Sequence, residues 1–141
     1  MKRCAALLTV MLACTTGLSA GLEAPTARVK ITQAHLVALC LNRQALSPAV
    51  REWTSEPRVQ QIGFTMRNEP RPGITSGPSG IAVVSFLPEA GHRYEIEVRA
   101  EPGSFSTRIW RRGQWTPVVR DRTTDRIVST EPDWQDTACG R

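Results

Sequence analysis

Apolar and polar residues alternate along much of the chain, which is the pattern of β-strands rather than of helices. The clearest case is RYEIEVRA at residues 93–100, where Tyr94, Ile96 and Val98 alternate with charged residues of both signs. Because neighbouring side chains of a strand point to opposite faces, one face of this segment is apolar and the other is charged. The segment therefore predicts a half-buried antiparallel strand with one face in water.

Further segments show the same alternation or a short apolar run bounded by turn residues. They cover residues 27–32, 34–42, 58–66, 81–86, 105–110, 114–119 and 127–130. The run at 34–42 fits either a buried strand or a short helix. Strand-like segments about ten residues apart, with turn residues between them, are typical of antiparallel all-β domains. We therefore expect an all-β fold, an antiparallel sandwich or a small barrel of six to eight short strands, in one domain over residues 27–141.

Two stretches depart from this strand pattern. Ser47 is a good helix N-cap and Pro48 is favoured at the first helical position, so we expect a short helix near residues 48–53. Residues 68–80 hold three Pro and three Gly, which excludes a regular element. This second stretch predicts a long exposed loop.

The N-terminus has the composition of an export signal. Lys2 and Arg3 precede an uncharged run from Cys4 to Ala13. A membrane-spanning helix needs about 20 apolar residues, so this run is too short to be one. A basic start followed by a short apolar stretch is typical of a secretory leader. We therefore expect residues 1–13 to be a signal peptide, and we exclude them from the fold.

Two cleavage sites are compatible with this leader. The sequence MLAC at residues 11–14 resembles the bacterial lipoprotein box, in which the cysteine thiol takes a diacylglycerol and becomes the first residue after cleavage; Met11 departs from the leucine usual at its position. Small residues also cluster before Ala20, where an ordinary signal peptidase would cut and discard Cys14. We expect lipid attachment at Cys14, with residues 14–26 as anchor and flexible tether.

Two of the four cysteines remain in the exported domain. Cys4 leaves with the leader and Cys14 is acylated or discarded, so Cys40 and Cys139 are left as an even pair. Export implies an oxidising compartment, in which such a pair normally closes. We expect a disulfide that ties an irregular C-terminal tail to an early segment; two separate buried thiols are the alternative.

The charge distribution argues against a nucleic-acid partner. After residue 13 the chain has sixteen basic residues against thirteen acidic ones, and the two signs are interspersed. Nucleic-acid binders instead cluster cations on one face with aromatics between them. The one local excess is Arg108, Arg111 and Arg112, and export places it away from nucleic acid.

The segment VVSFLPEAGHRYEIEV at residues 83–98 resembles a hairpin of small, uncharacterised proteobacterial envelope lipoproteins with a β-sandwich-like domain. The resemblance lies in a turn of the form Pro-Glu-x-Gly-x-x-Tyr, here Pro88, Glu89, Gly91, His92, Arg93 and Tyr94. Together with Cys14 and the late Cys139, it covers about a third of the chain. It implies a sandwich fold and an envelope location, and Thr15 in place of Asp after the lipidated cysteine implies the outer membrane, facing the periplasm. No catalytic or ligand residue carries over from that family.

No catalytic or metal-binding motif stands out. His35 and His92 are the two histidines, and neither has a further ligand at metal-binding spacing. Ser79 lacks the G-x-S-x-G setting of a hydrolase nucleophile, which leaves a Ser79–His92–Asp triad as a weak alternative. A glycosidase carboxylate pair could come from Glu95, Glu97 and Glu101, but those on the wet face of the strand are better explained by solubility. We therefore expect no enzyme, no metal and no cofactor.

Four neighbouring residues form the one candidate binding surface. Trp110 and Trp115 flank a turn that contains Arg111 and Arg112. If both rings project to one side, they make an aromatic platform with two cations, suited to a carbohydrate, a peptide or an anionic envelope polymer. The alternative is that one ring packs in the core and the other packs against a neighbouring strand.

Two functions of different classes fit these features. The first is an exported envelope lipoprotein with a non-enzymatic binding or structural role, held to the membrane by the lipid on Cys14 and bound to an envelope protein or polymer. The second is an inhibitor or immunity protein that plugs another envelope protein with the loop at 68–80 or the hairpin at 110–115. Without lipidation, the protein would be soluble in the periplasm or secreted.

Overall fold

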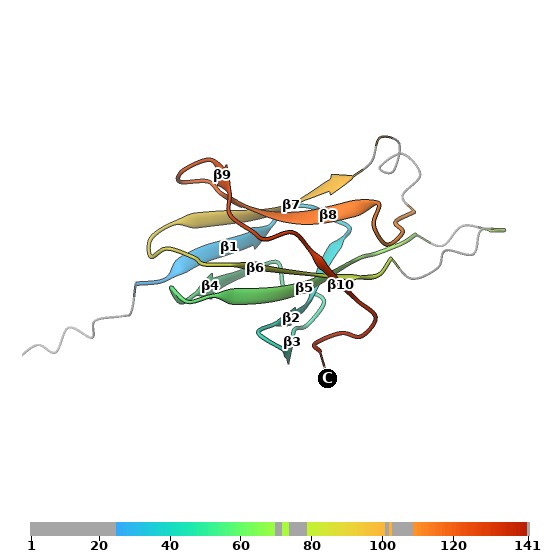
Figure 1. Cartoon of the computed structure of the whole chain (residues 1–141), viewed down its shortest axis with the longest axis horizontal. Coiled ribbons are helices and arrows are strands. Elements are labelled where there is room, and N and C mark those ends of the chain that lie inside the picture. The colour runs from blue at the N-terminus through green and yellow to red at the C-terminus, as the bar shows by residue number, and fades with distance from the viewer. Residues whose placement is uncertain (1–24, 70–71, 74–78, 101, 103–108, 141) are drawn as a thin grey trace, which may run out of the picture.

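The computed structural model describes residues 25–69, 72–73, 79–100, 102 and 109–140, and these residues fold as two stacked β-sheets without a helix (Figure 1). The strands in chain order are β1 (Ala27–Ile31), β2 (Leu36–Leu41), β3 (Gln44–Ala45), β4 (Glu52–Ser55), β5 (Gln60–Met66), β6 (Ile81–Phe86), β7 (Arg93–Ala100), β8 (Trp115–Asp121), β9 (Arg126–Ile127) and β10 (Asp133–Gln135). The two sheets have five strands each and do not close into a barrel. The expected all-β class is confirmed, and of the two expected architectures the chain adopts the sandwich.

The strand order shows how distant segments meet. One sheet has the order β4-β1-β7-β8-β9 and is called sheet A here, and the other has the order β10-β6-β5-β2-β3 and is called sheet B. Every pair is antiparallel except β1 and β7, which run parallel with Arg28 opposite Arg93 and Ile31 opposite Ile96. The expectation of antiparallel pairing throughout was wrong for this pair, because strands so far apart in sequence are not joined by a hairpin that would set their direction.

The core lies between the sheets and follows the alternation of the sequence. Tyr94 and Ile96 of β7 are buried, as are Ile62 and Phe64 of β5. On the opposite, outer face of sheet A the charges of β7 pair with arginines of β8 and the turn after it. Those contacts are Arg122 Nε to Glu95 Oε2 at 2.6 Å, Arg122 Nη2 to Glu97 Oε1 at 2.9 Å and Arg120 Nε to Glu97 Oε2 at 3.4 Å. The predicted half-buried strand with one wet face is confirmed.

The short helix expected near residues 48–53 does not form. Ser47 caps a single turn instead: its carbonyl accepts a hydrogen bond from Val50 N at 3.0 Å and its Oγ accepts one from Ala49 N at 3.4 Å. The chain then enters β4, because the Arg51 carbonyl accepts a hydrogen bond from Ile31 N at 2.8 Å. Strand pairing with β1 therefore replaces helix propagation after the first turn.

The other segments agree with the sequence only in part. The ambiguous run at 34–42 is a strand, β2. The tail after Glu131 is not wholly irregular, because β10 forms there and pairs with β6. The strand expected at 105–110 lies mostly outside the described residues, and the part that is described belongs to no strand. No helix in the described part of the chain is long and apolar enough to cross a membrane.

The sandwich has two distinct ends. β1 and β7 start at the same end, called the N-terminal end, where Gly91 N donates to the carbonyl of Thr26 at 3.1 Å. β5 and β7 finish at the opposite end (Figure 1). There the carboxamide of Asn68 accepts from Trp110 N at 2.7 Å and donates to Trp110 O at 3.2 Å. This double hydrogen bond joins the segment after β5 to the segment before β8.

Candidate functional site

The aromatic platform expected around residues 110–115 is not present. Trp110 is 0 % exposed and Trp115 is 1 % exposed, so both rings belong to the core. Trp115 Nε1 donates to the carbonyl of Ser79 at 3.1 Å, and its ring meets that of Trp134 edge-on with the centroids 5.1 Å apart. Burial of a large apolar surface outweighs the exposure that ligand stacking would need. The prediction that these rings form a binding surface was therefore wrong.

The two arginines between these tryptophans remain at the surface. Arg111 is exposed, and Arg112 Nη1 pairs with Asp136 at 2.7 Å. Arg112 Nη2 also donates to the carbonyl of Trp134 at 2.9 Å. Arg112 therefore fastens the turn after Trp110 to the segment of β10, which is a structural role. The proposed plug at 68–80 lies in large part outside the described residues.

The serine and histidine of the alternative triad lie at opposite ends of β6. Ser79 precedes this strand and is buried, with its Oγ 3.1 Å from Met66 N and 2.7 Å from Thr65 Oγ1. His92 follows the far end of the same strand. A six-residue strand is about 20 Å long, so the two side chains do not meet. Ser79 instead anchors the start of β6 to the end of β5.

His92 has a partner of its own in sheet A. Its Nδ1 lies 2.8 Å from Oδ2 of Asp121, whose residue is 2 % exposed, and its Nε2 lies 3.6 Å from Glu89 Oε2. Burial alone would raise the pKa of Asp121, but hydrogen bonds from His92 and from Thr123 N outweigh it and hold this pKa below the usual carboxyl value. Because a carboxylate only accepts hydrogen bonds, Nδ1 carries the proton.

The other chemistry-bearing residues also have structural contacts. His35 is half-buried, and its carbonyl accepts from Arg67 N at 2.7 Å. Glu95 and Glu97 are paired with Arg120 and Arg122, and Glu101 lies outside the described residues. Among the residues that the structure describes, no group of three or more His, Cys, Asp or Glu side chains lies close enough together to hold a metal ion.

The expected disulfide is present between Cys40 of β2 and Cys139 of the C-terminal segment, with their Cα atoms 5.3 Å apart. A β-bulge in β2 determines on which face of sheet B this disulfide lies. Leu36 and Ala38 point into the core, and without the bulge Cys40 would follow them. The register shift between Ala38 and Cys40 sets Cys40 opposite Gly63, on the outer face of sheet B. Cys139 reaches it there, and the two sulfurs close over the sheet.

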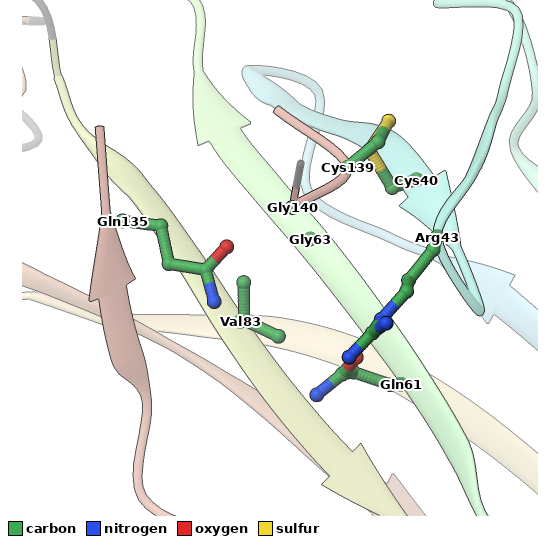
Figure 2. A pocket seen from close by; sticks show the side chains of 8 residues that line it. All are labelled: Cys40, Arg43, Gln61, Gly63, Val83, Gln135, Cys139 and Gly140. Atoms are coloured by element: carbon green, nitrogen blue, oxygen red, sulfur yellow. A yellow bond between two sulfur atoms is a disulfide. The ribbon is translucent and has the colours of Figure 1, made fainter. Parts of the chain in front are cut away.

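A cavity of about 180 Å³ lies beside this bridge on the outer face of sheet B (Figure 2). Its lining comes from β2 and the turn after it, from β5, β6 and β10, and from the C-terminal segment. The lining residues are Cys40, Arg43, Gln61, Gly63, Val83, Gln135, Cys139 and Gly140. Figure 2 shows Gln135 entering from the β10 side, and Arg43 and Gln61 from the opposite side, with Val83 between them. We call this hollow the disulfide pocket.

Gly63 creates the floor of the disulfide pocket. A Cβ at this position would be 3.7 Å from Cys40 Cβ and 3.7 Å from Ile81 Cγ2, which is ordinary contact. The missing side chain therefore leaves space that a larger residue would fill. Among the described residues, the polar side chains around that space are one guanidinium and two carboxamides, and none is acidic. The carboxamide of Gln135 is held by Asp133, whose Oδ2 accepts a hydrogen bond from Gln135 Nε2 at 3.2 Å.

Arg43 stands in an unfavourable backbone conformation. The two residues that join β2 to β3, Asn42 and Arg43, have φ of 50° and 67°. Positive φ at both central positions is the type I′ hairpin turn, whose second position usually holds Gly. A long side chain there costs of the order of 1 kcal/mol in backbone strain. Arg43 also has no hydrogen-bond or ion-pair partner among the described residues.

Sequence reasoning located the disulfide and missed the pocket beside it. Its polar residues are scattered over three segments, at 43, 61 and 135, and no motif links them. The one local signal is Arg43 at the position of a tight turn. Comparison of the chain with protein-family models, with curated proteins and with solved structures finds no match.

Proposed function

We propose that this chain is an exported envelope lipoprotein, anchored through Cys14, whose sandwich binds a partner without catalysis. The observation that carries the proposal is the Cys40–Cys139 bridge, which lies on the outer face of sheet B and joins residues 99 positions apart in the sequence. A structural disulfide of this kind persists in an oxidising compartment and is rare in the cytosol. It supports the export that the leader predicts.

The position of β1 supports attachment from the N-terminal side. Thr26 accepts a hydrogen bond from Gly91 N, and β1 starts at Ala27, so Thr26 is already held at the N-terminal end of the sandwich. The segment that would carry the lipid precedes this end, while β5 and β7 finish at the other. A lipid on Cys14 would therefore attach the sandwich to the membrane from its N-terminal end.

A binding role fits the contacts of the candidate catalytic residues. Ser79 is hydrogen-bonded to the backbone of Met66, and His92 is hydrogen-bonded to Asp121, at opposite ends of β6. The disulfide pocket, in contrast, offers the Arg43 guanidinium, which has no partner among the described residues, beside an apolar floor. These are the features of a recognition site, which needs convergent polar groups in a concave surface.

The test is a pair of cysteine variants in the producing cell. Cys14→Ala is expected to abolish incorporation of labelled fatty acid and to move the protein from the membrane to the soluble envelope fraction. Cys4→Ala is the matched control, because Cys4 would leave with the leader; labelling and fractionation should remain as in the unmodified chain. The lipid anchor would be refuted if the Cys14→Ala variant stayed in the membrane fraction and neither it nor the unmodified chain incorporated labelled fatty acid.

A further inference from the structure

We infer that the disulfide pocket recognises a single carboxylate presented by a protein partner. This inference names the ligand chemistry of the binding module proposed above, and it rests on that proposal only for the compartment in which the partner is met. The pocket lies on a folded surface, so binding to it is measurable whether or not the chain is lipidated.

The polar groups of the pocket match a carboxylate. Arg43 contributes a guanidinium, whose N–H groups fit the two oxygens of a carboxylate side by side. Gln61 and Gln135 contribute carboxamides from two further strands, and Figure 2 shows them on either side of Val83. None of the lining residues that the structure describes is acidic, and the guanidinium forms no ion pair with any of them. A hollow whose one charged group among the described residues is a guanidinium favours a negatively charged guest.

The backbone of Arg43 provides a second, independent observation. The second position of a type I′ turn favours Gly, and Arg43 holds φ at 67° there. Strain of this kind is concentrated at functional sites, where the side chain is needed despite its conformational cost. The hydrogen bonds of Asn42 to Gln60 and Gln61 hold the turn, but the Arg43 side chain itself has no hydrogen-bond or ion-pair partner among the described residues.

The volume of the pocket limits the size of the group that can occupy it. Drug-sized ligands occupy clefts of about 300–1,000 Å³. A cavity of about 180 Å³ is smaller and accommodates one residue-sized group. The apolar part of that group would lie on Val83 and the disulfide, with its charge towards Arg43. An acidic side chain or the carboxyl terminus of a polypeptide meets both demands, and the experiment separates these two sources.

The experiment is an NMR titration of the purified full-length protein, followed at the amides of Gly63 and Gly140. N-acetyl-glutamate N-methylamide presents a side-chain carboxylate and N-acetyl-alanine presents a terminal one; N-acetyl-glutamine N-methylamide and N-acetyl-alanine amide are their neutral counterparts. We expect at least one carboxylate to shift both amides with a Kd of about 1–10 mM, and the neutral probes to shift neither. Absence of a shift with both carboxylates, or equal shifts with the neutral probes, would overturn the inference.

Variants separate recognition from folding. Arg43→Gln should weaken the carboxylate affinity about tenfold, since it removes a charge-assisted hydrogen bond. Arg126→Gln removes the same charge from an exposed position of β9 and should leave the affinity unchanged. Gly63→Leu keeps Arg43 and fills the cavity, and should abolish the shift of Gly140. Equal affinities of Arg43→Gln and Arg126→Gln would contradict the proposal.

The Arg43→Gly variant distinguishes a role in binding from a role in stability. Glycine relieves the positive φ, so the thermal unfolding midpoint should stay unchanged or rise by a few degrees, while carboxylate binding is lost. A lowered midpoint would show that the arginine serves the fold rather than a ligand. The titrations measure carboxylate binding, and the fractionation of Cys14→Ala measures membrane attachment. A negative result in one does not affect the other, so the two proposals are tested separately.

Discussion

His92 links the buried Asp121 of β8 to the first strand of the sandwich. Its imidazole Nδ1 lies 2.8 Å from Oδ2 of Asp121, and its carbonyl accepts a hydrogen bond from Arg28 N at 3.1 Å. One residue of the β6–β7 turn thus contacts both neighbours of β7 in sheet A. This arrangement fixes the N-terminal end of the sandwich, through which the proposed anchor acts.

The Asp121 carboxylate makes stability depend on acid pH. Its folded-state pKa is held below the usual carboxyl value, so its contribution is fully present above the unfolded-state pKa near 4 and is lost as pH falls through the folded-state value. Asp121→Asn removes this contribution, and we expect a loss of about 1–3 kcal/mol at pH 7 that shrinks below pH 4. Urea unfolding between pH 3 and 7 measures it.

The control for this titration is Asp125→Asn in the neighbouring turn. Asp125 is exposed, with its carboxylate 3.4 Å from Arg120 Nη1 and 3.8 Å from Arg122 Nη1. Exposed pairs contribute little, so this variant should follow the pH profile of the unmodified protein. Parallel profiles for Asp121→Asn and the unmodified protein would show that Asp121 is not the group that titrates.

The disulfide should account for a large part of the stability. In the chain-entropy account, closing a loop of 99 residues stabilises the fold by about 4–5 kcal/mol. The Cys40→Ala/Cys139→Ala double variant should therefore unfold at much lower denaturant concentration, and reduction of the unmodified protein should reproduce that shift. The double variant should be insensitive to reductant. An unmodified protein whose unfolding does not respond to full reduction would contradict this prediction.

The tryptophans of the 110–115 turn should behave as core residues. Trp115→Ala is expected to lower the free energy of unfolding by about 3–5 kcal/mol, because it leaves a cavity and an unpaired Ser79 carbonyl. Arg111→Ala, in the same turn but exposed, should change it by less than about 0.5 kcal/mol. Chemical denaturation of both variants makes the comparison. A stable Trp115→Ala variant would restore the idea of a surface aromatic.

The sequence predicted those parts of the fold that depend on local alternation. β5 and β7 are read directly from their period of two residues, because one face packs in the core and the other meets water. β10 was missed because three residues carry no period and its partner, β6, lies far away in the chain. The expected helix at 48–53 was wrong because pairing of Arg51 with β1 is a tertiary contact that local propensity does not contain.

The candidate site shows the same division. Pairing of Cys40 with Cys139 was predictable by counting cysteines in an exported chain. The bulge at Leu39, which turns Cys40 to the outer face of sheet B, was not, since a one-residue register shift leaves no mark in the apolar pattern. The pocket depends on that shift and on the missing side chain of Gly63, and so required the three-dimensional arrangement.

The mass of the mature protein, purified from native envelopes, is the most direct test of the exported, anchored state. The account predicts a chain that begins at Cys14 with a covalently attached lipid and that contains no free thiol in its folded domain. A chain that still begins at Met1 would contradict export altogether, and an unmodified chain that begins at Gly21 would contradict the lipid anchor.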